Sequence, residues 1–173
     1  MTSVIKMKSK KTVFVTVGTT SFDALIKVVS SQHLCQQLKS MGYSKVLLQI
    51  GRGVYEPEPI DLRGFTLEYY RYKDCIAEDI KNASLVISHA GSGSVLESLG
   101  VGKPLIVVIN QLLMGNHQME LAYQLYLDGH LLYAKCSNLS EVLSELDISQ
   151  LKPFPSADPS KFSSFLDKAM GLS

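Results

Sequence analysis

The chain has 173 residues, of which 46% are hydrophobic and 19% charged, and its formal net charge is +1. This length fits a single domain that buries its own core, and the near-zero net charge gives no reason to expect nucleic acid or a highly acidic partner. The longest apolar runs, such as Leu105–Ile109, are too short to cross a bilayer. The three cysteines, Cys35, Cys75 and Cys136, match no zinc spacing and suit reduced thiols. We therefore expect a cytosolic globular protein.

Residues 1–11 carry four lysines without an apolar core of signal-peptide length, so we expect a short flexible start. From residue 12 onward, short apolar runs alternate with helical spacing, which predicts an α/β fold with a parallel sheet covered by helices on both faces. Six strands are predicted, at Thr12–Val17, Lys45–Ile50, Thr66–Tyr70, Leu85–Ser88, Leu105–Ile109 and Leu131–Ala134. Helices are predicted at 22–29, 34–41, 76–83, 94–99 and 117–127, with Gly42 ending the second and Gly129 the last.

The carboxyl-terminal part of the chain contains two further helix signals. Asn138 is predicted to cap a helix, with Glu141 as its capping-box partner. After the proline-rich stretch Lys152–Pro159, a short amphipathic helix is predicted, with an apolar stripe formed by Phe162, Phe165, Leu166, Ala169 and Met170. The stripe must be buried against this domain or against a partner. We thus expect a main domain over 12–152 and a separate docking element over 153–173.

Three loops after predicted strands are rich in small residues and hydrogen-bond donors. In an open parallel sheet, ligands bind beyond the carboxyl ends of the strands, where loops lead into helix N-termini. The loops follow the first, fourth and fifth strands, at 18–23, 89–94 and 110–118. These segments are where a binding site is expected.

The loop after the fourth strand contains Gly91, Ser92, Gly93 and Ser94. Glycine lets a backbone approach a ligand closely, and the N–H groups at a helix start favour an anion, so this loop could cradle a diphosphate. It could equally be a tight strand-to-helix turn with a serine as the N-cap. On the residues alone, both interpretations stay open.

Other polar residues near these loops have two interpretations as well. Glu97, on the helix after the glycines, could accept hydrogen bonds from two ribose hydroxyls or could be a solvated helix residue. His117 and Gln118 could contact sugar hydroxyls or lie on the surface. His89 could be a catalytic group, or it could shape the loop as a wall of the pocket, which we favour.

Common nucleotide and hydrolase motifs do not fit this loop. Leu96 stands where the third glycine of a dinucleotide fingerprint would fall, and no G-x-x-x-x-G-K-S/T is present. The run from Gly91 to Ser94 does not form the G-x-S-x-G of a nucleophile elbow. Nicotinamide enzymes, P-loop NTPases and serine hydrolases are therefore disfavoured.

Taken together, the motifs resemble one family. The segments that carry the resemblance occur in order, at Gly18–Asp23, Leu48–Gly53, Tyr70–Asp74, Leu85–Ser94 with Glu97, Gly102–Leu105 and Asn116–Gln118. They closely resemble the catalytic, cytosolic subunit of the eukaryotic UDP-GlcNAc transferase of dolichol-linked oligosaccharide synthesis. More distantly, they are similar to the carboxyl half of the bacterial lipid II-forming GlcNAc transferase of glycosyltransferase family 28.

The resemblance implies the Rossmann-like C-terminal half of a GT-B glycosyltransferase, which binds the nucleotide-sugar donor. The acceptor-binding half would then come from a separate membrane-anchored subunit, which would recruit this chain to the cytosolic face of the endoplasmic reticulum.

The resemblance also implies roles for individual residues. The backbone near Tyr72 and Lys73 would meet the uracil, and Glu97 would hold the ribose. The diphosphate would lie against Ser92, Gly93 and Ser94, with Gly91, Thr19 and Thr20 beside it. The GlcNAc hydroxyls would contact Asn116, His117 and Gln118, with His89 as a pocket wall. The first loop departs from the glycine-richer loop of the bacterial relatives, since Thr19 and Thr20 follow Gly18.

The implied reaction transfers GlcNAc, with inversion, to the 4-hydroxyl of a lipid-linked GlcNAc. A helix N-terminus would stabilise the leaving diphosphate in place of a metal ion, so no cofactor is expected. The general base is expected on the partner subunit, with His89 as the candidate within this chain. The alternative is a nucleotide-sugar-binding regulatory module without transferase activity.

Overall fold

The computed structural model describes residues 10–60, 62–110 and 116–154. Within them, six strands form one fully parallel sheet in the order β3-β2-β1-β4-β5-β6. The strands are β1 Thr12–Thr16, β2 Lys45–Gln49, β3 Thr66–Tyr70, β4 Leu85–His89, β5 Leu105–Ile109 and β6 Leu132–Lys135. All six predicted strands are confirmed, with ends that differ by at most one residue.

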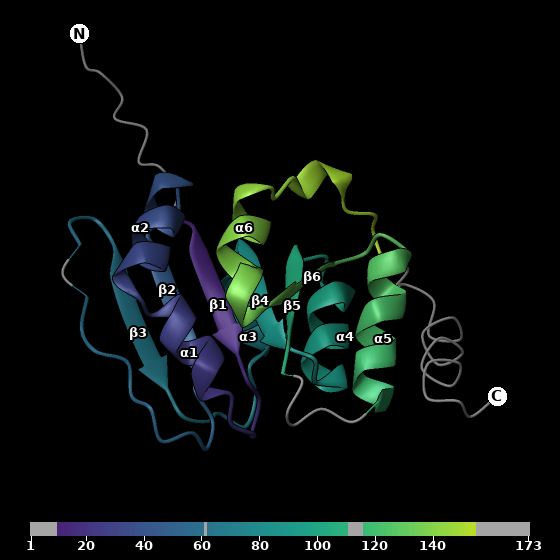
Figure 1. Cartoon of the computed structure of the whole chain (residues 1–173), viewed down its shortest axis with the longest axis horizontal. Coiled ribbons are helices and arrows are strands. Elements are labelled where there is room, and N and C mark those ends of the chain that lie inside the picture. Colours follow the sequence, from purple (N-terminus) through teal and green to yellow (C-terminus); the bar gives the residue numbers. More distant parts are fainter. Residues whose placement is uncertain (1–9, 61, 111–115, 155–173) are drawn as a thin grey trace, which may run out of the picture.

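Helices cover both faces of the sheet, as predicted. They are α1 Asp23–Val29, α2 Gln32–Ser40, α3 Ala77–Asn82, α4 Ser92–Gly100, α5 Asn116–Leu127 and α6 Leu139–Ser144, with short 3-10 turns η1 Cys136–Asn138 and η2 Ile148–Gln150. One apolar cluster joins α1, α2 and α6 to one face, and in Figure 1 these helices lie in front of the strands. A second cluster joins α3, α4 and α5 to the other face.

The alternation of side chains along each strand supplies both clusters. Val13 and Val15 of β1 contribute to the first cluster, whereas Phe14, between them, contributes to the second. Since a strand in the middle of a covered sheet is apolar on both sides, β5 is buried along its whole length. The continuous apolar runs of the sequence have this physical origin.

The helix ends confirm two predictions and correct one. Gly42 follows α2 with φ 102° and Gly129 follows α5 with φ 82°, in the left-handed region that glycine adopts without strain. Asn138 is the N-cap residue of α6, but the predicted capping box with Glu141 is wrong. Its Oδ1 instead accepts a hydrogen bond from the backbone N–H of Lys135, at 2.7 Å.

The connection from β2 to β3 departs from the predicted alternation of strand and helix. The described residues of 50–65 contain no helix, only an isolated bridge between Leu62 and Phe65. This long connection extends beyond the carboxyl ends of the strands, as the lower left of Figure 1 shows. It therefore contributes to the region where ligands are expected.

The order of the strands reverses at β1. β1 pairs with β2 on one side and with β4 on the other, so the loops after β1 and β4 leave the sheet in neighbouring positions. Such a topological switch point leaves a crevice at the carboxyl ends of the strands.

Two points remain, one on membrane segments and one on the ends of the chain. No helix of the described residues is long and apolar enough to cross a membrane. The flexible start and the amphipathic helix with its apolar stripe lie outside the described residues, except for residues 10 and 11.

Candidate functional site

The loops after β1 and β4 meet at the side chain of His89. A Cβ atom placed on Gly18 would lie 2.9 Å from Nε2 of His89, and one placed on Gly91 would lie 2.5 Å from the same atom. Gly18 also has a φ of 65°. The imidazole thus contacts two loops at the switch point, and both contacts require glycine.

Burial lowers the pKa of His89 from 6.5 to about 4. The imidazole is therefore neutral at neutral pH, with one ring nitrogen as a donor and the other as an acceptor. A neutral ring can hydrogen-bond to a ligand and shape the crevice, but it adds no positive charge opposite a diphosphate. These properties suit a pocket wall, the role favoured for His89.

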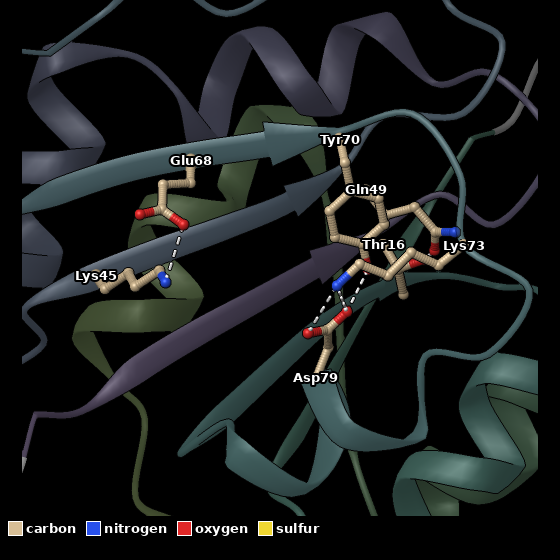
Figure 2. A network of polar contacts seen from close by, with 7 residues as sticks. All are labelled: Thr16, Lys45, Gln49, Glu68, Tyr70, Lys73 and Asp79. Carbon is tan, nitrogen blue, oxygen red and sulfur yellow. Dashed lines mark hydrogen bonds and ion pairs between the residues drawn. The ribbon is translucent and has the colours of Figure 1, made fainter.

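The β1 loop is held by its own hydroxyl groups. Oγ1 of Thr16 donates to Oε1 of Gln49 on β2, as Figure 2 shows, and accepts a hydrogen bond from the N–H of Gly18 at 3.0 Å. Oγ1 of Thr20 donates to the carbonyl oxygen of Val17 at 2.9 Å. Since this bond occupies the only proton of the Thr20 hydroxyl, Thr19 is the better donor to a diphosphate.

A cavity of about 500 Å³ lies beside this loop. Residues from the loops after β1, β2 and β3 line it: Thr19, Gly51, Arg52, Arg71 and Tyr72. Of the predicted site residues, Thr19 and Tyr72 come together here, and the Tyr72 side chain is 56% exposed.

The cavity also contains residues to which the sequence assigned no role. Arg52 and Arg71 bring positive charge to its lining, and the N–H of Arg52 donates to the carbonyl oxygen of Thr20 at 3.0 Å. Gly51 has a φ of 63°, and a Cβ there would lie 2.0 Å from that same carbonyl oxygen. A glycine next to an arginine directly after a buried strand was the signal that could have identified this loop.

Asp23, the first residue of α1, helps to fix the β2 loop. Its Oδ2 accepts a hydrogen bond from the N–H of Val54 at 3.1 Å, while its Oδ1 is buried without a hydrogen-bond partner. A Cβ on Gly53 would lie 1.9 Å from Oδ1. Glycine at 53 therefore lets the loop pass directly over the carboxylate.

The Lys73 side chain is engaged away from the cavity. Its Nζ lies 3.0 Å from Oδ2 of Asp79 and 4.3 Å from the ring centroid of Tyr70. If residues 72 and 73 contact a base, Lys73 must do so with its backbone, which is the contact that the resemblance implies.

Helix α4 begins directly after the β4 loop, at Ser92. Gly91 is its N-cap residue and has no side chain to cap the first N–H groups. A Cβ on Gly93 would meet no atom of the described residues within 4 Å, so these residues leave the space beside Gly93 open. The alternative of a serine N-cap is wrong, and binding of a diphosphate by the first turn of α4 stays a prediction.

The remaining predicted site residues lie on helices that start from the same end of the sheet. Glu97 is an exposed residue of α4. Asn116, His117 and Gln118 form the start of α5, and their side chains lie outside the described part of the chain. No geometry here tests their roles, or that of Ser94, and these stay predictions.

Two further observations concern metal ligands and a second cavity. The described residues contain no group of three or more His, Cys, Asp or Glu side chains that could hold a metal ion. A second cavity, of about 200 Å³, includes Pro104, His130 and Phe154 in its lining. It lies at the amino-terminal ends of β5 and β6, away from the loops described above.

Comparison with known proteins identifies the domain. Residues 12–170 match the glycosyltransferase family 28 C-terminal domain. The chain belongs to this family. The six-stranded parallel sheet and the switch point are thus those of a family 28 C-terminal domain, and the predicted family and fold class are confirmed.

Several proteins similar to this chain are named "UDP-N-acetylglucosamine transferase subunit ALG13". The human protein is 59% identical over 130 residues, which are 75% of this chain but 11% of the human protein. The mouse protein is 56% identical over the same share of each chain. The Saccharomyces cerevisiae protein is 32% identical over 84% of this chain and 89% of its own length. The chain thus spans about a tenth of the mammalian relatives and most of the yeast one.

Solved structures show the same fold. The solution structure of ALG13 superposes with a TM-score of 0.68 at 28% identity, over 91% of this chain and 95% of that one. MurG from Acinetobacter baumannii superposes with a TM-score of 0.60 at 17% identity, over 97% of this chain and 47% of MurG. The likeness to MurG shows the fold alone.

Proposed function

We propose that this chain is the donor-binding subunit of a two-subunit inverting transferase that moves GlcNAc from UDP-GlcNAc to a lipid-linked GlcNAc. The observation that carries the proposal is the junction of the Gly18 and Gly91 loops at His89, directly before the open N-terminus of α4, in a family 28 C-terminal domain. Several relatives named as UDP-GlcNAc transferase subunits support the donor.

The donor would extend from the cavity to the start of α5. Its uracil would lie near the backbone of Tyr72 and Lys73, and Glu97 would accept hydrogen bonds from the ribose. The first turn of α4 and Thr19 would bind the diphosphate. The GlcNAc would face His89 and the start of α5, where Asn116, His117 and Gln118 would contact its hydroxyls.

The reaction would be a single displacement at the anomeric carbon. The 4-hydroxyl oxygen of the acceptor forms the new bond as the bond from the anomeric carbon to the UDP oxygen breaks, which inverts the configuration. The helix dipole of α4 stabilises the charge that develops on the leaving diphosphate without any metal ion. The acceptor proton goes to a general base on the partner subunit, because the acceptor approaches from that side.

The partner would be a membrane-anchored subunit that binds the acceptor, and it would recruit this chain to the cytosolic face of the endoplasmic reticulum. Support comes from the word "subunit" in the names of the relatives. The apolar stripe from Phe162 to Met170 is the proposed docking element. Truncation before Pro159 should abolish co-purification with the membrane subunit, and an intact complex would remove the stripe from the interface.

Two measurements test the proposal. Titration calorimetry of the purified chain with UDP-GlcNAc should show binding, and absence of binding would refute the donor site. Transfer to a lipid-diphosphate-GlcNAc acceptor should require co-purified membrane subunit. Transfer by the chain alone would refute the two-subunit enzyme. Binding without transfer by the complex would favour a regulatory module.

A further inference from the structure

Two side chains, those of Tyr70 and Lys73, converge on the carboxylate of Asp79 at the carboxyl end of β3. Oδ2 of Asp79, on α3, accepts a hydrogen bond from the Tyr70 hydroxyl at 2.5 Å. Nζ of Lys73 lies 3.0 Å from Oδ2 and 3.3 Å from Oδ1 of the same carboxylate. The Lys73 ammonium also lies over the Tyr70 ring, as Figure 2 shows. Asp79 therefore links the last residue of β3 to the middle of the connection 71–76.

This link is partly shielded from water. The Asp79 side chain is 13% exposed, and burial together with the Asp79 hydrogen bond raises the pKa of Tyr70 above its usual value. The hydroxyl thus stays protonated and continues to donate. The Lys73 side chain is 46% exposed, so the shielded part of the link is the hydrogen bond from Tyr70 to Asp79. By contrast, Lys45 and Glu68 form an ion pair on β2 and β3 with side chains 34% and 60% exposed. An exposed pair contributes little, whereas a shielded charge-assisted hydrogen bond contributes more.

Arg71, on the other side of Tyr72, is held as well. Its Nη1 donates to the carbonyl oxygens of Gly53 at 2.7 Å and Gly51 at 3.3 Å, and its Nη2 lies 2.9 Å from Oε1 of Glu56. Tyr72 therefore lies between two residues whose side chains are held by partners, and it lines the cavity together with Arg71. A flat aromatic ring in such a position can lie against a nucleotide base.

We propose that Asp79 is a positioning residue for recognition of the nucleotide base. Through Tyr70 and Lys73 it fixes the connection that presents Tyr72 and the backbone of residues 72 and 73 to the cavity. The inference rests on the proposed function, because it assumes that a uridine nucleotide binds there.

Removal of the Asp79 charge should loosen this connection but leave the diphosphate and ribose contacts in place. Those contacts come from α4 and the β1 loop, which Asp79 does not touch. The loss of nucleotide affinity should therefore depend on which base the nucleotide carries. UDP and ADP share the diphosphate and the ribose, so the ratio of their affinities isolates this effect.

The test compares the dissociation constants of the full chain for UDP and ADP in Asp79→Asn, Tyr70→Phe and Glu68→Gln, with thermal unfolding of each. Asp79→Asn should weaken UDP binding about tenfold and ADP binding much less. Tyr70→Phe should also weaken UDP binding. The variant that carries both Asp79→Asn and Tyr70→Phe should lose less binding free energy for UDP than the sum of the two single losses. Glu68→Gln, in the exposed pair of the same sheet edge, should bind UDP like the parent chain.

Unchanged UDP affinity in folded Asp79→Asn and Tyr70→Phe would overturn the inference. An equal loss of affinity for UDP and ADP would also overturn it, because it would show that Asp79 has only a structural role. If Asp79→Asn does not fold, Tyr70→Phe, which keeps the ring and the carboxylate, decides alone. A parent chain that binds UDP no better than ADP would instead refute the proposed function, and the inference with it.

Discussion

Nε2 of His89 and the backbone of Gly91 lie so close together that a Cβ at position 91 would be 2.5 Å from the ring. Backbone and ring cannot both keep their places if a side chain is added. The imidazole also contacts Gly18, so its displacement would reach the β1 loop as well. The arrangement makes the position of the ring depend on both glycines.

Gly91→Ala should therefore weaken UDP-GlcNAc binding at least tenfold and destabilise the fold by roughly 1–3 kcal/mol, as overpacking does. Calorimetry and urea unfolding measure the two effects. Gly93→Ala is the matched control for stability, because its Cβ would meet no atom within 4 Å in the part of the chain that the structure describes. Gly93→Ala should keep the stability of the parent yet lose affinity, since the methyl group would occupy the space proposed for the diphosphate. Parent-like affinity in both variants would contradict the cradle.

The stability of the protein should fall between about pH 6.5 and pH 4. The pKa of His89 is 6.5 when exposed and about 4 in the fold, so the unfolded chain binds the extra proton in this window. Stability then rises with pH across the window and is lost as pH falls, by up to about 3 kcal/mol. Urea unfolding at several pH values measures this slope. His89→Gln should remove most of it, and an unchanged slope would show that other groups cause it.

Thr19 and Thr20 should respond differently to substitution by valine. Thr20→Val loses the hydrogen bond to Val17 and should cost about 1 kcal/mol of stability. Thr19→Val removes an exposed hydroxyl at the cavity, so it should leave stability unchanged and weaken UDP binding several-fold. Each variant is the control for the other. Normal UDP affinity in Thr19→Val would exclude its hydroxyl from the site.

Glu97→Ala should weaken UDP-GlcNAc binding about tenfold without changing the unfolding midpoint. Its carboxylate is exposed on α4, so little packing is lost, whereas a charged acceptor of ribose hydroxyls contributes about this much. The control is Glu145→Ala, an exposed carboxylate at the end of α6, which should bind the donor normally. Unchanged affinity in Glu97→Ala would remove this residue from the site.

The strands were predictable because buried strands have continuous apolar runs in the sequence. Leu105–Ile109 is apolar at every position, and the structure buries β5 on both faces. The helix stops were predictable for a similar reason, since glycine at 42 and 129 adopts a positive φ. Asn138 was a correct N-cap position, but the partner of its side chain was wrong, because the side chain accepts its hydrogen bond from Lys135 in the preceding turn.

Part of the candidate site was predictable from the resemblance to the family. Thr19 and Tyr72 were named from their motifs and lie together at the cavity. Arg52 and Asp79 were missed, because their importance comes from partners that lie far away in sequence or on another element. Local patterns carry no information about such contacts.

The sequence by itself determined the α/β class, the elements and the family, because apolar periodicity, glycine stops and ordered motifs are properties of the chain. Only the tertiary structure decided which loops share a site. β1 lies between β2 and β4 in the sheet, and this order brings Gly18 against His89. Hydrogen bonding between strands that are remote in sequence sets that order, so the crevice exists only once the sheet is complete.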